Sequence, residues 1–313
     1  MILGIDIGYG YTKCFFSKNG SEMGSKIFRT AVSKFIPKAT FGEKIETYTI
    51  NGEEFIVGDD AIREGKLINT RRKDFVGSSP YYALLTYAMS VVTAPIDVLV
   101  LGLPPGQYTK EYVDELTSAM KNVDMRNSFN HQVTVPPVIR FIPQGAGIYF
   151  SHVLNGSPSD YGKRVAVLDI GYYTVDMLFF DKGKYVEGVA RSFPLGVFEV
   201  YESIKKAFTQ EYKTYIKNDE SVDTLIRNGV VEVAGVQYKM DCSKVYGFYN
   251  TQISSALEEY IEGLPSEVDV IISGGGGVCF LNGSCKYKIT TTMNPQLANA
   301  VGYYEYGKHF KNV

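Results

Sequence analysis

Tryptophan is absent from this chain, and histidine is nearly so, with three residues among 313. His131, His152 and His309 lie far apart, and none has a neighbour at the spacing of a metal-ligand pair or of a Ser-His or Cys-His catalytic pair. We therefore expect surface or packing roles for all three. The sequence disfavours histidine metal sites and nucleophilic hydrolases.

Cysteine is also scarce, and no two cysteines have the Cys-x-x-Cys spacing of a metal or redox site. Cys14 alternates with apolar neighbours, so we expect it to pack as a small hydrophobic residue. Cys242, Cys279 and Cys285 are scattered along the second half of the chain. This usage favours a reducing compartment over an oxidising one.

Strong charge of either sign and long apolar runs are missing too. The formal net charge of −2 provides no general attraction to nucleic acid or to an anionic membrane. No apolar run approaches the ~20 residues that span a bilayer, and no signal-peptide pattern is present. We therefore expect a cytoplasmic protein without membrane binding, which would associate with DNA only through a local patch or a partner protein.

The most informative pattern present is a repeat. Residues 3–16 read LGIDIGYGYTKCFF and residues 166–180 read AVLDIGYYTVDMLFF. Each copy is an apolar strand, a tight glycine-containing turn and a second apolar strand, which predicts a β-hairpin. Asp6 matches Asp169, and seven residues later Lys13 stands where the second copy has Asp176. The repeat indicates two similar lobes that face one another.

A weaker echo links residues 97–106 (DVLVLGLPPG) with residues 269–278 (DVIISGGGGV). Strands alternate with helices in both halves, which predicts an α/β fold with helices packed on mainly parallel sheets. The length suits about two domains. The segment 155–162 is rich in glycine, serine and aspartate, so we place the domain boundary there. We expect one helix to begin after Thr109 as N-cap and another to cover residues 249–264.

The repeated turns suit a polyphosphate. Glycine lets backbone N–H groups approach an anion, so the turns Asp6–Tyr11 and Asp169–Thr174 could hold two phosphates from opposite sides. Thr12 and Thr174 could add hydroxyl donors, and Lys13 could neutralise phosphate charge. Asp6 and Asp169 would then flank a Mg²⁺ ion, which takes one or two carboxylates, often through water, together with phosphate oxygens.

Gln144, Asp176 and the glycine run Ser273–Gly277 complete the candidate site. Gln144 follows a strand and either orients an attacking water molecule or caps a helix. Asp176 is either a partner for that water or a buried carboxylate that fixes the hairpin. The glycine run ends a buried strand, where open α/β folds bind ligands, and would support a nucleoside. It matches neither the P-loop pattern nor G-x-G-x-x-G.

In their order, these motifs resemble those of the actin-like ATPases, within the larger actin, sugar-kinase and Hsp70 group. Ile5–Lys13 is similar to the first phosphate loop, Ile142–Gly147 to the first connecting motif and Leu168–Asp176 to the second phosphate loop. Ile272–Gly277 is similar to the adenosine motif and Gln296–Gly302 to the second connecting helix. The sequence motifs GYGYTK and PQGAG most resemble those of ParM/StbA-type plasmid-segregation actins and their short archaeal relatives.

This resemblance implies a duplicated, ribonuclease H-like, two-lobe ATPase fold with a nucleotide cleft between the lobes. Lobe I would span 1–158, with a C-terminal helix at 303–313 packing back on it. Lobe II would span 159–302, with an insertion at about 197–265. One tyrosine-rich segment would either contribute to the filament interface or be buried by that last helix: Tyr303-Tyr304-Glu305-Tyr306.

The cofactors implied are ATP, with GTP as an alternative, and Mg²⁺. The catalytic residues would be Gln144, Asp169 and Asp176, and the metal residues Asp6 and Asp169, through water. The nucleotide-binding residues would be Asp6, Gly8, Tyr9, Gly10, Tyr11, Thr12, Lys13, Gly171, Tyr172, Tyr173, Thr174, Gly196, Gly274, Gly275, Gly276 and Gly277.

The function implied is ATP-dependent assembly of head-to-tail filaments, because a heterologous interface that does not close propagates. Hydrolysis would destabilise the polymer. For plasmid segregation the filament would bind a DNA-bound adaptor protein rather than DNA itself. Two alternatives stay open on the same fold: a small-molecule kinase, and a nucleotide switch that does not polymerise.

Overall fold

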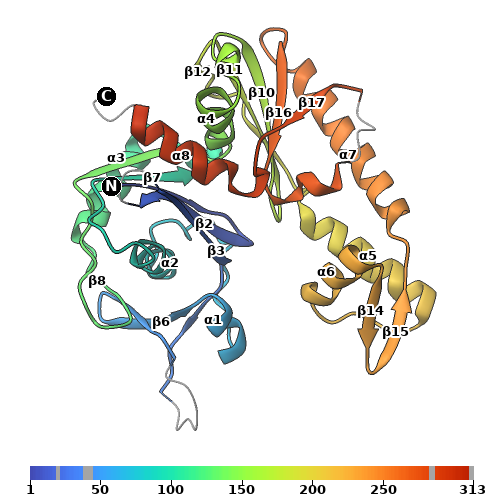
Figure 1. The fold of residues 1–313 in the computed structure, drawn as a ribbon, viewed down its shortest axis with the longest axis horizontal. Helices are drawn as coiled ribbons and strands as arrows, with labels where there is room; N and C mark the ends of the chain where they lie inside the picture. Colours follow the sequence, from blue (N-terminus) through green and yellow to red (C-terminus); the bar gives the residue numbers. More distant parts are fainter. Residues whose placement is uncertain (19–21, 38–44, 282–285, 310–313) are drawn as a thin grey trace.

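Each half of the chain is built on one sheet that contains a copy of the repeated hairpin (Figure 1). The computed structural model describes residues 1–18, 22–37, 45–281 and 286–309. The first sheet has the order β3-β2-β1-β7-β9, with β1 at Ile2–Ile7, β2 at Tyr11–Lys18, β3 at Glu22–Arg29, β7 at Val98–Leu103 and β9 at Val138–Pro143. The second has the order β12-β11-β10-β16-β17, with β10 at Arg164–Ile170, β11 at Val175–Asp181, β12 at Lys184–Tyr185, β16 at Val270–Gly274 and β17 at Ile289–Thr291. A short strand, β13 (Arg191–Phe193), pairs with β11.

The two sheets repeat one another strand for strand. β1 pairs antiparallel with β2 and parallel with β7, just as β10 pairs antiparallel with β11 and parallel with β16. The weaker echo in the sequence therefore marks equivalent strands, β7 and β16. The expectation of mainly parallel sheets is wrong, because a tight turn can join only antiparallel strands and each hairpin makes its half of the sheet antiparallel.

Two helices lie between the sheets, α4 (Ala146–Asn155) and α8 (Ala298–His309), drawn in green and red in Figure 1. α8 packs on β1, β2, β7 and α4, while α4 also packs on β10 and β16. Tyr303, Tyr304 and Glu305 are buried within α8. Of the two alternatives for this tyrosine-rich segment, burial by the last helix is therefore correct. The division into lobes at residues 158 and 159 stays a prediction.

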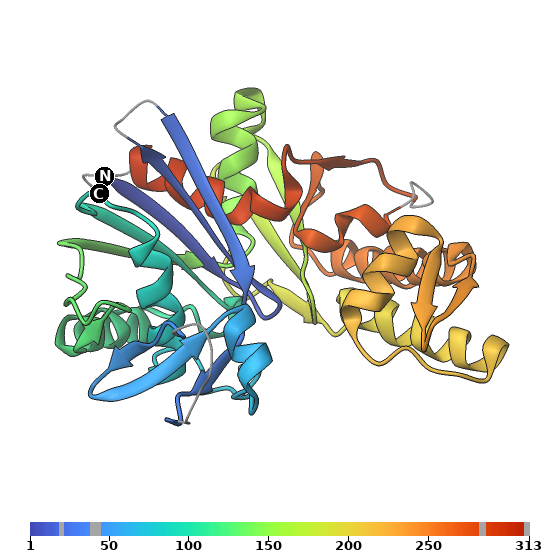
Figure 2. The ribbon, with the colours of Figure 1, turned by 60° about the horizontal axis from the view of Figure 1, so that its bottom comes forward.

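Smaller elements extend each half away from its sheet. The first half adds a four-stranded sheet of order β4-β6-β5-β8 and three helices, with β4 at Val32–Lys34, β5 at Tyr48–Ile50, β6 at Glu53–Val57, β8 at Met125–Arg126, α1 at Asp59–Glu64, α2 at Ser79–Ser90 and α3 at Lys110–Asn122. The second half adds α5 at Val197–Tyr212, α6 at Asp219–Asn228, β14 at Val230–Val233, β15 at Val236–Lys239 and α7 at Ser243–Glu262. Short 3-10 helices occupy Pro105–Gln107, Pro158–Asp160, Gly276–Phe280 and Pro295–Leu297. In Figures 1 and 2, α5, α6, β14 and β15 project as one group on the side opposite α2 and β6.

Helix starts follow local capping chemistry. The Thr109 side chain accepts a hydrogen bond from the N–H of Tyr112, so the predicted N-cap of α3 is confirmed. α7 begins at Ser243 rather than at Tyr249, because the Asp241 carboxylate accepts hydrogen bonds from the Ser243 N–H at 2.9 Å and from its hydroxyl at 2.8 Å.

Two expectations from the sequence concern Cys14 and membrane-spanning segments. Cys14 is fully buried within the core of the first half, as predicted. Within the described residues, no helix is long and apolar enough to cross a membrane.

Candidate functional site

The two repeated turns face each other across a cleft of about 690 Å³. They meet at their tips: a Cβ atom at Gly10 would lie 3.0 Å from the Cβ of Tyr172. The rings of Tyr9 and Tyr173 make an edge-to-face contact with centroids 5.8 Å apart. The hairpins that the sequence repeats thus form two opposite walls of one cavity.

Most of the residues predicted for the site line this cleft. The predicted residues in its lining are Asp6, Gly8, Tyr9, Gly10, Tyr11, Lys13, Gln144, Asp169, Gly171, Tyr172, Thr174, Asp176, Gly275, Gly276 and Gly277. Four predicted residues, Thr12, Tyr173, Gly196 and Gly274, are not in the lining and lie behind it or at its edge.

Thr12 is the clearest difference from expectation. Its side chain is fully buried, and its hydroxyl shares a hydrogen bond of 2.9 Å with the hydroxyl of Thr30. Consecutive strand residues point to opposite faces, so Lys13 faces the cleft and Thr12 faces the interior. The predicted role of the Thr12 hydroxyl as a phosphate donor therefore does not fit its position.

Gly196 packs against the second turn and Gly274 packs against α4, and neither lines the cavity. The Gly196 N–H donates to the carbonyl of Tyr173 at 3.1 Å, and a Cβ atom there would lie 2.3 Å from the Tyr173 carbonyl carbon. A Cβ atom at Gly274 would lie 2.7 Å from Ile148. Both glycines are therefore needed for close packing against the site.

Opposite charges pair in the first hairpin. Asp6 and Lys13 are cross-strand partners, and the Lys13 Nζ donates to the Asp6 carboxylate at 2.8 Å. Their side chains are 5% and 14% exposed. This pair is largely withdrawn from water, which strengthens its attraction.

The second hairpin instead places two carboxylates opposite each other, Asp169 and Asp176. Burial, followed by the negative charges of Asp6 and Asp176, raises the pKa of Asp169 to about 7. Burial also raises the pKa of Asp176, although hydrogen bonds from Ser192 and Thr174 oppose the shift. Asp6, Asp169 and Asp176 thus line one cleft together with Lys13, and a cation bound between these carboxylates would offset the repulsion that raises the pKa of Asp169.

A metal ion would need further ligands, because no cluster of three or more His, Cys, Asp or Glu side chains with metal-site geometry occurs in the described part of the chain. Asp6 and Asp169 nevertheless fit Mg²⁺, which commonly takes one or two carboxylates plus phosphate oxygens and water.

Asn299, on α8, was not foreseen as a site residue. Its Nδ2 donates to the Asp169 carboxylate at 2.6 Å, and its Oδ1 accepts from the Gly145 N–H at 3.1 Å. One side chain therefore connects the second turn to the start of α4. The signal available in the sequence was a polar residue between two alanines at the start of this helix.

Gln144 lies just before α4 without capping it. The N-cap of α4 is Gly145, with φ of 87°, and no side chain makes a cap hydrogen bond. The Gln144 Nε2 instead donates to the carbonyl of Ile7, at the end of β1, at 3.2 Å. The helix-cap interpretation is therefore not supported, and the amide lies beside the first turn.

The glycine run passes close to Asp169. Gly275 has φ of 91°, and a Cβ atom there would lie 2.7 Å from the Asp169 carboxylate. A Cβ atom at Gly277 would lie 2.4 Å from the side chain of Ile170. Only glycine allows this turn to lie against the second hairpin.

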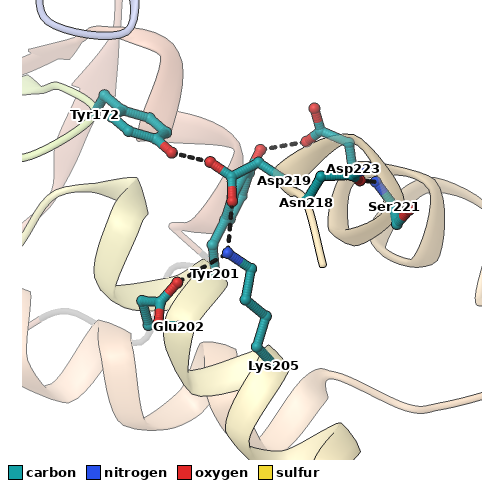
Figure 3. Close-up of polar contacts among 8 residues, drawn as sticks. All are labelled: Tyr172, Tyr201, Glu202, Lys205, Asn218, Asp219, Ser221 and Asp223. Carbon is teal, nitrogen blue, oxygen red and sulfur yellow. Dashed lines mark hydrogen bonds and ion pairs between the residues drawn. The ribbon is translucent and has the colours of Figure 1, made fainter. Parts of the chain in front are cut away.

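One wall of the cleft was not foreseen either. It includes Tyr201 of α5 and the α6 residues Asp219, Asp223 and Arg227, which follow each other at intervals of four and so share one helix face. Figure 3 shows the Tyr172 hydroxyl donating to Asp219 and the Tyr201 hydroxyl donating to Asp223. The helical spacing of these charges was the signal available in the sequence.

Comparison with protein families decides the affiliation. The family model described as actin-like proteins, N-terminal domain, matches residues 4–147. The model described as archaeal actin homologue MreB-like, C-terminal, matches residues 167–286. Together they match most of the chain. The chain belongs to the actin-like proteins.

Solved structures show the same fold for this actin-like protein. Ta0583, an archaeal actin homologue, is 20% identical with a TM-score of 0.76, and 99% of each chain is covered. ParM in a 15-stranded filament from Clostridium botulinum is 23% identical with a TM-score of 0.72, again with 99% of each chain covered. Ta0583 was also solved in complex with ADP, at 19% identity and a TM-score of 0.75, with 99% of each chain covered. Comparison with curated protein sequences finds no significant match. The predicted actin-like, two-lobe fold class is confirmed.

Proposed function

We propose that this actin-like protein binds ATP with Mg²⁺ in the cleft, hydrolyses it and assembles head to tail into filaments. The observation that carries the proposal is the pair of facing turns, which bring the carboxylates of Asp6 and Asp169 and the ammonium group of Lys13 to one cleft. GTP is the alternative triphosphate.

In this proposal the backbone N–H groups of both turns hold the β- and γ-phosphates, and Lys13 approaches them from the side of Asp6. Asp6 and Asp169 hold Mg²⁺, through water, and Asn299 fixes the orientation of Asp169. When bound, the ion neutralises phosphate charge. The nucleoside lies against Gly275–Gly277.

Gln144 and Asp176 act on the attacking water. The Gln144 amide can donate and accept at once, which suits the orientation of a water molecule in line with the γ-phosphate. One oxygen of Asp176 accepts from the Thr174 hydroxyl at 3.0 Å, which holds the turn, and the carboxylate also lines the cleft. In this proposal Asp176 therefore both fixes the hairpin and acts on the attacking water.

Replacing Gln144 with alanine is expected to lower turnover by about 100-fold while leaving nucleotide affinity largely unchanged, because the amide acts on water rather than on the nucleotide. Single-turnover phosphate release gives the rate, and titration with a fluorescent ATP analogue gives the affinity. Gln144→Glu is the matched control, since it retains the length of the side chain and one hydrogen-bonding oxygen. Unchanged turnover in Gln144→Ala would remove the residue from the mechanism.

Assembly is tested by 90° light scattering with simultaneous phosphate release, with ATP or GTP and Mg²⁺. We expect scattering to rise on addition of nucleotide and to decay as phosphate appears. Flat scattering over a wide range of protein concentration would reject the filament and leave the kinase or the non-polymerising switch. A ParM relative was solved as a filament, which supports testing assembly first.

The cellular role that we propose is segregation of plasmid DNA in the cytoplasm through a DNA-bound adaptor. The formal net charge of −2 supports an adaptor over direct contact with DNA. Co-sedimentation of filaments with DNA in the absence of any other protein would contradict this part of the proposal.

A further inference from the structure

An arginine at the end of β3 reaches from the first half of the chain to the second. The guanidinium of Arg29 pairs with the carboxylate of Glu220 on α6 at 3.2 Å, across 191 residues of sequence. The same guanidinium lies 5.2 Å from the ring centroid of Tyr11. The Arg29 side chain is 25% exposed, so its stem is largely held in place while the pair stays accessible to water.

A second arginine makes a similar connection. Arg71 lies in the loop between α1 and α2, with its guanidinium 4.4 Å from the ring centroid of Tyr173 in the second turn. Its neighbour Arg72 pairs with Asp74 inside the same loop. The basic run at 71–73 lies in an exposed loop, and Arg71 also contacts the opposite half.

The helix that carries Glu220 is attached to the second turn. The neighbouring residue Asp219 accepts the hydroxyl of Tyr172, and the Lys205 Nζ holds the other Asp219 oxygen at 2.7 Å (Figure 3). Lys205 is itself fixed by Glu202 at 2.9 Å. Side-chain hydrogen bonds therefore join the second turn to the start of α6, next to Glu220.

We propose that the pairs Arg29–Glu220 and Arg71–Tyr173 form a clasp that holds the two halves closed and sets the rate of nucleotide release. The proposal rests on the proposed function. Glu220, Arg71 and Tyr173 are not in the lining of the cleft, so they act on the nucleotide only through the position of the two halves, whereas Arg29 also lines the cleft. They are positioning residues.

The clasp is accessible to solvent, and this limits its strength. Exposed ion pairs and cation–π contacts each change an equilibrium by a few-fold. We expect Glu220→Ala or Arg71→Ala to speed nucleotide dissociation about two- to fivefold, and the double variant about tenfold. Because salt screens exposed charges, added NaCl is expected to speed release from the wild type more than from the double variant.

The test is stopped-flow displacement of a fluorescent ATP analogue, with Mg²⁺, from the full chain. Because Arg29 also lines the cleft, the decisive comparison is between Arg29→Glu alone and Arg29→Glu with Glu220→Arg, which share the change in the lining; the double swap is expected to restore slow release. A merely structural role of the two residues would not produce this rescue. The matched control is the swap of Lys34 and Glu53, an exposed pair at 2.8 Å within the first half, which should leave release unchanged.

Circular dichroism identifies any variant that does not fold, and Glu220→Gln then replaces Glu220→Ala because it keeps the shape of the side chain. Normal binding of the analogue with unchanged release in all clasp variants, or a charge swap as fast as the single swaps, would overturn the clasp alone. Absence of binding by the wild type would overturn the proposed function and the clasp together.

Discussion

Asp169→Asn is expected to lower hydrolysis by about 1,000-fold and, at the same time, to stabilise the nucleotide-free protein above pH 7. The first effect follows from the proposed function, because an amide cannot replace a carboxylate beside Mg²⁺. The stabilisation follows from the loss of the negative charge of Asp169. Burial and the neighbouring carboxylates Asp6 and Asp176 raise the pKa of Asp169 to about 7, so its ionised form is unfavourable in the folded protein.

The direction in which pH changes the free energy of unfolding follows from proton binding to Asp169. Between the ordinary pKa of an aspartate and pH 7, the folded protein holds a proton on Asp169 that the unfolded chain has lost. The free energy of unfolding therefore falls as pH rises through this range, and the penalty is complete above pH 7. At about 1.4 kcal/mol per pKa unit, it amounts to a few kcal/mol. Asparagine removes it and can still accept the hydrogen bond from Asn299.

Chemical denaturation of the nucleotide-free protein in EDTA, at pH 5 and pH 8, measures this effect. We expect the gain in stability of Asp169→Asn to be about two- to threefold larger at pH 8 than at pH 5. Asp269→Asn is the control of opposite sign, because hydrogen bonds from Arg164 lower the pKa of Asp269 to about 2. That favourable charge is present above pH 4 and lost as pH falls towards 2, so its removal should destabilise the protein at pH 8. Equal stability of Asp169→Asn and wild type at pH 8 would contradict the assignment.

The hairpins could be predicted because their signal is local. Alternation of apolar residues and a glycine turn place Asp6 opposite Lys13, and Asp169 opposite Asp176, within a few residues of chain. The repeat then indicated that the two turns face each other. Strand alternation also predicts that Thr12 faces the opposite side of the sheet from Lys13. The prediction of a phosphate-binding role rested on the hydroxyl group alone and did not take this alternation into account.

The remaining parts of the site depend on contacts between distant segments. Tyr172 meets Asp219 across 47 residues, and Asn299 meets Asp169 across 130. Periodicity shows which face of a helix is polar, but it does not show which strand that face meets. The α6 wall and the role of Asn299 therefore became visible only in the folded chain.

The second large effect is expected from Gly302→Ala, where α8 crosses α4. A Cβ atom at Gly302 would lie 1.7 Å from the carbonyl oxygen of Gly147, and one at Gly147 would lie 2.4 Å from the carbonyl oxygen of Asn299. The two helices thus touch through their backbones. A backbone atom cannot rotate away as a side chain can, so alanine must push the helices apart. We expect a loss of more than about 4 kcal/mol in the free energy of unfolding.

Urea unfolding followed by circular dichroism measures this loss, and Gly247→Ala is the matched control. Gly247 also lies inside a helix, α7, but a Cβ atom there would meet nothing within 4 Å, so alanine should be neutral or stabilising by about 0.5–1 kcal/mol. A Gly302→Ala protein as stable as the wild type would show that the helices can separate without cost. Their contact also holds Asn299 against Asp169 and against the start of α4. A variant that still folds should therefore lose hydrolysis more than nucleotide affinity, because the packing of two glycines determines the geometry of Asp169, the carboxylate that we propose to be catalytic.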